Sequence, residues 1–167
     1  MDVTRRDKSE TSFWRAWLPA LFWLGVIIVE STSALSAEKT SRILYPLLHF
    51  LFGVDLAHFA PWHLVLRKAG HVLGYGILSF LLFRAWRATI AVTGNPRFSA
   101  IWASIAISMS ALVASLDEWH QTLLLSRTGS MRDALLDTAA AVAAQVLMYL
   151  WLRRSGRTSS VSSPRTA

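Results

Sequence analysis

The chain has 167 residues, of which 53% are hydrophobic and 16% charged, and its mean hydropathy is +0.39. Soluble domains carry about 25% charged residues, so this composition excludes an ordinary soluble domain and indicates an integral membrane protein. The chain has no cysteine, which excludes disulfides, thiolate metal sites and cysteine nucleophiles. The net charge of +7 lies mostly between and beyond the apolar stretches, a distribution that disfavours a nucleic-acid partner.

Four apolar stretches predict an all-α fold, a transmembrane bundle of four helices. A helix needs about 20 residues to cross the bilayer. The first uninterrupted stretch, Ala16–Val29, is shorter, but the small residues that follow it extend the helix. A cleaved signal peptide, with Ala34-Leu35-Ser36 as its cleavage motif, is the alternative for this segment. We predict a membrane domain over residues 16–152, with spans at about 16–36, 69–86, 99–116 and 134–152.

The connections between the spans carry further predictions. Ile43–Val54 is apolar but too short to cross the bilayer, so we predict an interfacial or re-entrant segment between the first two spans. Pro61 suits the first position of a helix, which we expect over Trp62–Trp86. The third helix is expected to continue beyond its span to about Thr122. Serine and arginine dominate residues 153–167, which predicts a disordered tail.

The basic residues predict the orientation of the chain in the membrane. Of the seventeen lysines and arginines, four lie in residues 1–15, three flank the connection between the second and third spans, and four lie in the tail. The positive-inside rule assigns this side to the cytoplasm, so the N-terminus, the tail and thus both termini are expected inside. The polar clusters described next are then expected on the extracytoplasmic side.

The first polar cluster lies on the second span. Its members follow one another at spacings of three, four and four residues: Lys68, His71, Tyr75 and Ser79. These spacings place them within about 80° of one another on one helix face. Taken singly, Lys68 could extend to the interface and Tyr75 could join two helices. Because ionisable groups in a span are costly, the aligned set predicts a site shared with acidic residues elsewhere.

The second cluster lies at the outer end of the third span and contains Asp117, Glu118 and Gln121. Adjacent carboxylates point in different directions on a helix, so we expect one to face inward and the other to lie along the interface. The inward carboxylate needs a cation, and Lys68 or Arg127 is the expected partner. A salt-bridged helix end is the alternative to a chemical role for this cluster.

The third cluster, Arg127, Ser130 and Asp133, lies where the fourth span begins. Ser130-x-x-Asp133 matches the capping-box pattern, with Asp where Glu or Gln is usual, so capping alone could explain both residues. Capping does not explain Arg127, nor Asp137 one turn deeper on the same face. An aspartate costs about 2.5–3.5 kcal/mol at the centre of a span and less near its end, so Asp137 must be paired or protonated.

Metal binding is not predicted. Nitrogen and oxygen ligands could come from His71, His120, Asp117 and Glu118. The sequence nevertheless contains no local metal motif such as His-Glu-x-x-His and no phosphate-binding glycine loop. We therefore predict neither a metal nor another cofactor.

In these three clusters the chain resembles the VanZ-like family of bacterial integral membrane proteins. The resemblance rests on three motifs within residues 65–145: Lys68-x-x-His71-x-x-x-Tyr75, Asp117-Glu118-x-x-Gln121 and Arg127-x-Gly129-Ser130-x-x-Asp133. Two positions differ, because the family usually has asparagine and glycine where this chain has Asp137 and Ala140; the first difference alters the charge of the site. The resemblance implies a four-span protein of the bacterial cytoplasmic membrane. The name-giving member is linked to reduced sensitivity to the lipoglycopeptide teicoplanin.

The leading functional hypothesis is an extracytoplasmic site for an anionic envelope lipid or a lipid-linked cell-wall precursor. The predicted ligand-binding residues are Lys68, Tyr75, Gln121, Arg127, Ser130, Asp133 and Asp137. An enzyme would use Glu118 or Asp117 as general acid or base, assisted by His71. A non-catalytic structural or partner-binding membrane protein is the second hypothesis, and a small transporter or proton relay is the third.

Overall fold

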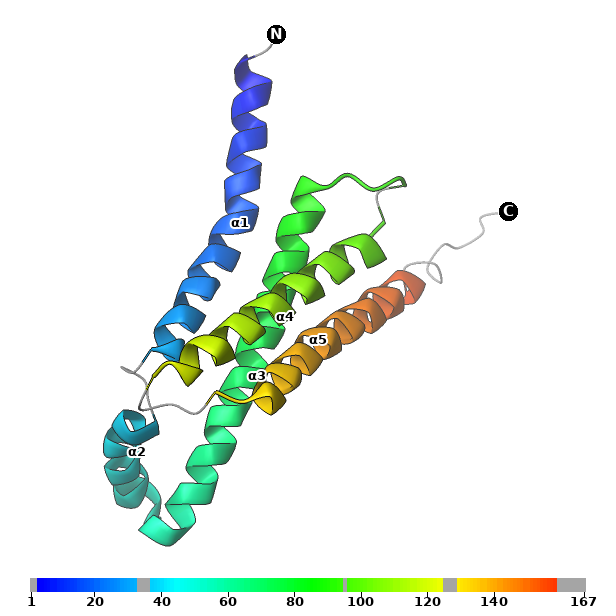
Figure 1. Ribbon diagram of the computed structural model, residues 1–167. Helices are drawn as coiled ribbons and strands as arrows, with labels where there is room; N and C mark the ends of the chain where they lie inside the picture. Colours follow the sequence, from blue (N-terminus) through cyan, green and yellow to red (C-terminus); the bar gives the residue numbers. More distant parts are fainter. Residues whose placement is uncertain (1–2, 33–36, 95, 125–128, 159–167) are drawn as a thin grey trace.

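The computed structural model describes residues 3–32, 37–94, 96–124 and 129–158. These residues form five α-helices and no strand: α1 Val3–Ser31, α2 Ala37–Phe52, α3 Leu56–Thr89, α4 Ala100–Thr122 and α5 Met131–Thr158 (Figure 1). Four of the described helices, α1, α3, α4 and α5, are long and apolar enough to cross a membrane, whereas α2 has only 16 residues. The prediction of an all-α protein with four candidate spans is therefore confirmed.

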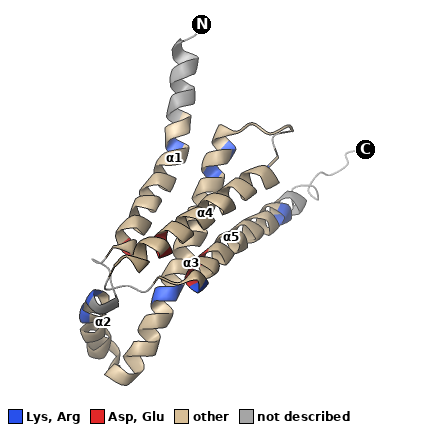
Figure 2. Ribbon diagram, in the orientation of Figure 1, with Lys and Arg blue, Asp and Glu red and all other residues tan. Residues whose placement is uncertain are grey.

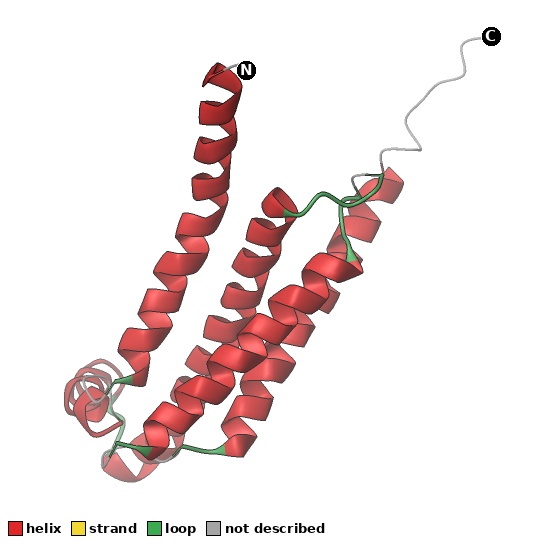
Figure 3. Cartoon of the chain, turned by 45° about the horizontal axis from the view of Figure 1, so that its top comes forward, coloured by secondary structure: helices red, strands yellow, loops and turns green. Residues whose placement is uncertain are grey.

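The four long helices run side by side and reverse direction at each connection. The start of α1, the α3–α4 connection and the end of α5 lie at one end of the bundle (Figures 1 and 3). The end of α4, the start of α5 and the short helix α2 lie toward the other end. Lysine and arginine positions of α1, α3 and α5 occur at the first end, and others occur on α2 and toward the start of α3 (Figure 2). This agrees with a chain that crosses four times, while the cytoplasmic assignment of that end stays a prediction.

Small and aromatic side chains fill the interior of the bundle. Ala106, Ala114 and Ala141 are fully buried and let neighbouring helices approach closely. Trp102 is also buried, and its indole N–H donates to the carbonyl of Ile90 at 2.9 Å. Large apolar side chains such as Phe22 are exposed on the outside instead. Such an outer surface is what a lipid environment requires.

Two tryptophans fix α1 against α3. The Trp17 indole N–H donates to the Thr89 hydroxyl at 2.9 Å, and the Trp17 ring lies edge-on to Trp86 with ring centroids 5.1 Å apart. Further along α1, the Trp23 indole N–H donates to the carbonyl of Gly74 at 2.8 Å. A partly buried indole N–H needs a partner, so these bonds set the rotation and depth of α1 relative to α3.

Two helix ends differ from the predictions. α1 ends at Ser31 instead of continuing to residue 36, and the Thr32 hydroxyl bonds the carbonyl of Val29 at 2.7 Å. Hydroxyl side chains compete in this way with helix continuation. Residues 33–36, with the predicted cleavage motif, lie outside the described residues. α5 continues to Thr158, so the tail predicted to be disordered is helical over residues 153–158.

The predicted interfacial segment is a helix. α2 begins well before Ile43 and runs through Pro46, and it ends before Gly53, whose φ of 66° suits glycine. α2 packs on the first turns of α3, where the rings of Tyr45 and Phe59 meet edge-on at 5.2 Å. Its position at a membrane interface stays a prediction.

Pro61 does not begin the next helix, contrary to the prediction. α3 begins at Leu56, because the carboxylate of Asp55 accepts a hydrogen bond from the backbone N–H of His58 at 2.8 Å and caps the helix. This backbone bond lowers the pKa of Asp55. Pro61 lies in the second turn of α3, where its missing N–H leaves unpaired only a carbonyl near the helix start.

Candidate functional site

The polar face of α3 is paired with acidic side chains of α5. Lys68 Nζ lies 2.6 Å from Asp133 Oδ1, at a position where the lysine side chain is 49% exposed. One turn deeper, His71 Nδ1 lies 3.1 Å from Asp137 Oδ2, and the Asp137 side chain is fully buried. The structure therefore brings four sequence-predicted site residues together. It also provides the partner that an aspartate inside a span requires.

The next residue of the α3 face pairs with α4. The Tyr75 hydroxyl donates to Asp117 Oδ2 at 3.0 Å, and the Gln121 amide donates to Asp117 Oδ1 at 3.0 Å. Asp117 and Glu118 are both buried, so the prediction that one of them lies along the interface is wrong. α4 packs against both α3 and α5, so the two neighbouring sides of α4 that carry Asp117 and Glu118 both face other helices. Neither carboxylate pairs with Lys68.

Glu118 is bonded to the backbone that enters α5. Its Oε2 accepts a hydrogen bond from the backbone N–H of Ser130 at 2.6 Å. The preceding Gly129 packs so closely on the end of α4 that a Cβ at this position would collide with the Glu118 carbonyl and with Thr122. Glycine is thus required here for close approach, which explains the Gly129-Ser130 part of the third motif.

Ser130 caps α5 without completing a capping box. Its hydroxyl accepts a hydrogen bond from the backbone N–H of Arg132 at 3.2 Å. The Asp133 carboxylate pairs with Lys68 instead of returning to the Ser130 N–H, and Glu118 occupies that N–H. Capping therefore accounts for Ser130 but not for Asp133. Arg127, the remaining predicted member of this cluster, lies outside the described residues.

A buried amide extends the polar row and was missed in the sequence. The Gln145 side-chain amide donates to the Ser79 carbonyl at 2.9 Å and to the Ser79 hydroxyl at 2.8 Å, and that hydroxyl donates to the carbonyl of Ala141. Spacing alone could have found it, because Asp133, Asp137, Ala141 and Gln145 recur every four residues. Such a period marks one helix face.

His120 lies apart from this network. Its Nδ1 is 3.0 Å from the hydroxyl of Ser31 at the end of α1. His120 is exposed and belongs to the boundary between α1 and α4. The structure therefore separates it from His71, although both were considered as metal ligands.

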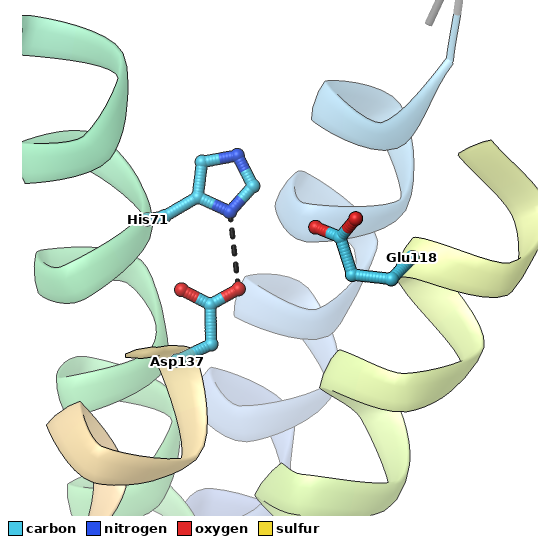
Figure 4. Close-up of side chains that lie close together, drawn as sticks. All are labelled: His71, Glu118 and Asp137. Carbon is cyan, nitrogen blue, oxygen red and sulfur yellow. Dashed lines mark hydrogen bonds and ion pairs between the residues drawn. The ribbon is translucent and has the colours of Figure 1, made fainter. Parts of the chain in front are cut away.

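Three side chains from three helices converge at the centre of the cluster (Figure 4). His71 of α3, Glu118 of α4 and Asp137 of α5 each offer one nitrogen or oxygen atom, and these atoms all lie within 4.8 Å of one another. Glu118 and Asp137 are buried, and His71 is half-buried. The second oxygen of Asp137, Oδ1, has no hydrogen-bond partner among the described residues.

Three cavities adjoin the cluster. A small polar cavity is lined by His71, Tyr75, Asp117 and Gln121 together with residues of α1. A cleft of about 260 Å³ lies between α1, α2 and α3 and also reaches His71. A groove of about 450 Å³ lies between α1 and α4 and reaches Asp117. The polar cluster is thus accessible from two directions.

Four membrane-length helices around a paired polar cluster define a multi-pass helical membrane protein with one candidate site. The VanZ/LLP1 family profile matches residues 16–152, which include all four candidate spans almost completely and all three polar motifs. The chain therefore belongs to the VanZ/LLP1 family, as the motif resemblance predicted. No curated protein and no solved structure matches the chain significantly.

Proposed function

We propose that the protein lies in the bacterial cytoplasmic membrane and binds an anionic envelope lipid, or a lipid-linked cell-wall precursor, at an extracytoplasmic site. The observation that carries this proposal is that an apolar groove and a cleft with charged side chains adjoin one small cavity, which shares Asp117 with the groove and His71 with the cleft. A ligand that has a hydrocarbon chain and a polar head group matches such a pair of neighbouring spaces.

The groove between α1 and α4 suits the hydrocarbon chain. Its volume of about 450 Å³ lies within the usual range of ligand sites. Its apolar lining consists of Leu24, Ile27, Ile28, Val113 and Leu116. Polar groups occur at one end only, where Ser31, Asp117 and His120 line it. A lipid chain in this groove would therefore place its head group beside the polar cluster.

The cleft between α1, α2 and α3 suits the head group. Its lining includes Arg67 and His71 as well as the acidic Glu30, and a guanidinium is well matched to a phosphate. Lys68, which the sequence predicts as a phosphate ligand, pairs with Asp133 but stays half exposed. Because an ammonium has three donors, Lys68 can bind an anion without leaving Asp133.

His71 is the side chain best placed for chemistry on such a ligand. It lines both the cleft and the small polar cavity, whereas Glu118 is not among the residues that line either. Asp137 bonds Nδ1 of the ring and so positions it. An enzyme would therefore use His71 for proton transfer, with Asp137 as positioning residue, and Glu118 would hold the α4–α5 junction.

The test is mass spectrometry of envelope lipids and lipid-linked precursors from cells that carry wild type, His71→Ala, Glu118→Gln or an empty vector, at matched membrane abundance. Lipids that stay bound to the purified proteins are measured in parallel. His58→Ala is the matched control, because His58 also pairs with an aspartate but lies exposed at the start of α3.

A lipid enriched with wild type and His58→Ala, and lost with His71→Ala, would support the binding site. A species converted by wild type but only bound by His71→Ala would identify an enzyme. If conversion is lost in Glu118→Gln but kept in His71→Ala, the catalytic residue is Glu118 and not His71. Identical lipid profiles for wild type and His71→Ala, in cells and on the purified proteins, would overturn the proposal. Glycopeptide sensitivity of the same strains shows whether the lipid affects antibiotic access.

A structural role is the second candidate, favoured by how thoroughly the cluster is paired. Lys68, His71 and Tyr75 bond α5 and α4 in succession, and Ser79 continues the row. Interhelical hydrogen bonds of this kind stabilise membrane bundles by about 0.6 kcal/mol each. In that case His71→Ala lowers the amount of folded protein while the lipid profile follows protein abundance alone.

A further inference from the structure

We infer that His71, Glu118 and Asp137 form a binding site for one divalent transition-metal cation of the Zn²⁺ class. This inference goes beyond the lipid proposal, because the cation can be measured on the protein without any lipid; in the metal-bound protein His71 is a metal ligand and is not the residue that transfers a proton. The ligand atoms of the three residues lie within 4.8 Å of one another. Zinc forms bonds of about 2.0–2.2 Å with imidazole and carboxylate ligands, so side chains whose ligand atoms lie up to 4.8 Å apart would move closer together when the cation binds.

A buried oxygen without a partner points to a missing ligand. Asp137 is fully buried, and its Oδ1 accepts no hydrogen bond within the described part of the chain. An orphaned carboxylate oxygen at such a position costs free energy. A cation held by both oxygens of Asp137 would satisfy Oδ1, which the hydrogen bond from His71 to Oδ2 does not.

The charge balance of the cluster also favours a cation. Its carboxylates are Asp117, Glu118, Asp133 and Asp137. Within the described residues, the basic side chains that pair with them are Lys68 and His71. Counted over the described residues alone, and with both bases charged, two positive groups lie opposite four negative ones; Arg127 lies outside these residues and is not part of the count. Buried negative charge of this kind is stable only when it is paired, protonated or bound to a metal.

The ligand set defines the class of metal. One imidazole and two carboxylates form a mixed nitrogen and oxygen site, which zinc, manganese and iron accept better than magnesium or calcium. The Glu118 carboxylate is held in place for this role, since the backbone N–H of Ser130 donates a hydrogen bond to it at 2.6 Å. The half-buried His71 reaches the cleft and so leaves an entry path and an open coordination position.

The experiment uses the full chain, purified in detergent through an affinity tag that contains no histidine and freed of metal by a chelator. Zinc uptake is then measured by calorimetry and by elemental mass spectrometry. We expect about one zinc per chain, and affinity at least about tenfold weaker in His71→Ala and in the isosteric Asp137→Asn. His58→Ala, which removes a surface histidine paired with Asp55, should bind zinc like wild type.

Failure to take up zinc or manganese would overturn the inference. So would uptake that persists in folded His71→Ala and Asp137→Asn, or that is lost in His58→Ala, because these results identify adventitious surface binding. If the variants do not fold, X-ray absorption of zinc-loaded wild type decides the question. One imidazole with oxygen ligands supports the site, and two or more imidazoles, or none, contradict it. Lipid binding without zinc binding would refute only this inference.

Discussion

At the scale of single residues, the hydrogen bonds to Asp117 show how the polar cluster is held together. Each of its two oxygens accepts one hydrogen bond, from Tyr75 and from Gln121. The carboxylate is buried between α3 and α4, so a lost donor would not be replaced by bulk water. The Tyr75 side chain is 2% exposed and its ring fits the core, which makes the hydroxyl the only group that a phenylalanine would remove.

Tyr75→Phe should therefore destabilise the protein while it preserves the packing. We expect a loss of about 0.6–2 kcal/mol, the range for one hydrogen bond in a membrane bundle or a buried site. The measurement is unfolding in detergent followed by tryptophan fluorescence. Tyr149→Phe is the control, because Tyr149 is exposed near the other end of the bundle. Equal stability of the two variants would show that the Tyr75–Asp117 bond contributes nothing measurable.

Gly129 allows a second residue-scale prediction. A Cβ at this position meets the backbone of α4, which cannot yield as a flexible side chain would. Gly129→Ala should cost about 1–3 kcal/mol, as overpacking does, and should displace the Ser130 N–H from Glu118. Gly25→Ala on α1 is the control, since nothing lies within 4 Å of a Cβ there. A Gly129→Ala variant as stable as Gly25→Ala would contradict the close approach.

At the scale of helices, the sequence predicted which elements exist better than where they begin. α4 follows its prediction closely, since Ser99 caps its start and the apolar pattern continues to Thr122. The start of α3 differs from its prediction. In the sequence, Pro61 suits the first position of a helix just as well as Leu56 does, but Asp55 caps the helix before it. A proline five residues into a helix breaks only one bond, so its presence did not decide the boundary.

The partners in the cluster were harder to predict than its members. Spacing placed Lys68, His71 and Tyr75 on one face, and the structure shows them so. Which carboxylate meets which cation depends on the rotation and depth of three helices, and these follow from tertiary contacts such as that of Trp23. The sequence thus expected Lys68 beside Asp117 or Glu118, whereas it lies beside Asp133 on α5.

Helix α2 carries an element-scale prediction. Ile43, Leu47 and Phe50 share one of its faces and are exposed, while Arg42 and His49 are exposed about a third of a turn away, on a neighbouring side of the helix. This pattern predicts a helix that lies in the membrane interface with its apolar face toward the lipid. Because the chain has no cysteine, single cysteines can report the depth of each face.

We expect Arg42→Cys to react with a membrane-impermeant maleimide in membranes, and Phe50→Cys to be protected by lipid. The measurement is the labelled fraction of each variant, with complete labelling after denaturation as the reference. Equal and rapid labelling of both would show that α2 lies in water. Equal protection of both would place α2 within the bilayer as a re-entrant segment.

At the scale of the whole molecule, the direction of insertion decides which compartment the cluster faces. Arginines at the end of α3, such as Arg84 and Arg87, and at the end of α5, such as Arg153, lie at the end opposite to α2 (Figures 1 and 2). The positive-inside rule predicts that this end lies in the cytoplasm. The lipid proposal depends on this orientation, because cell-wall precursors are used on the outer side of the membrane.

Thr93→Cys in the α3–α4 connection and Arg42→Cys on α2 test the orientation directly, since both positions are exposed and they lie toward opposite ends of the bundle. In intact spheroplasts the impermeant maleimide should label Arg42→Cys and spare Thr93→Cys, and both should be labelled after lysis. The lysed sample controls for reactivity, because a cysteine that stays unlabelled there reports burial and not sidedness. The reverse pattern would place the polar cluster in the cytoplasm. It would leave the helix pairing and the proposed metal site unaffected, but the ligand would then have to be a lipid of the inner leaflet.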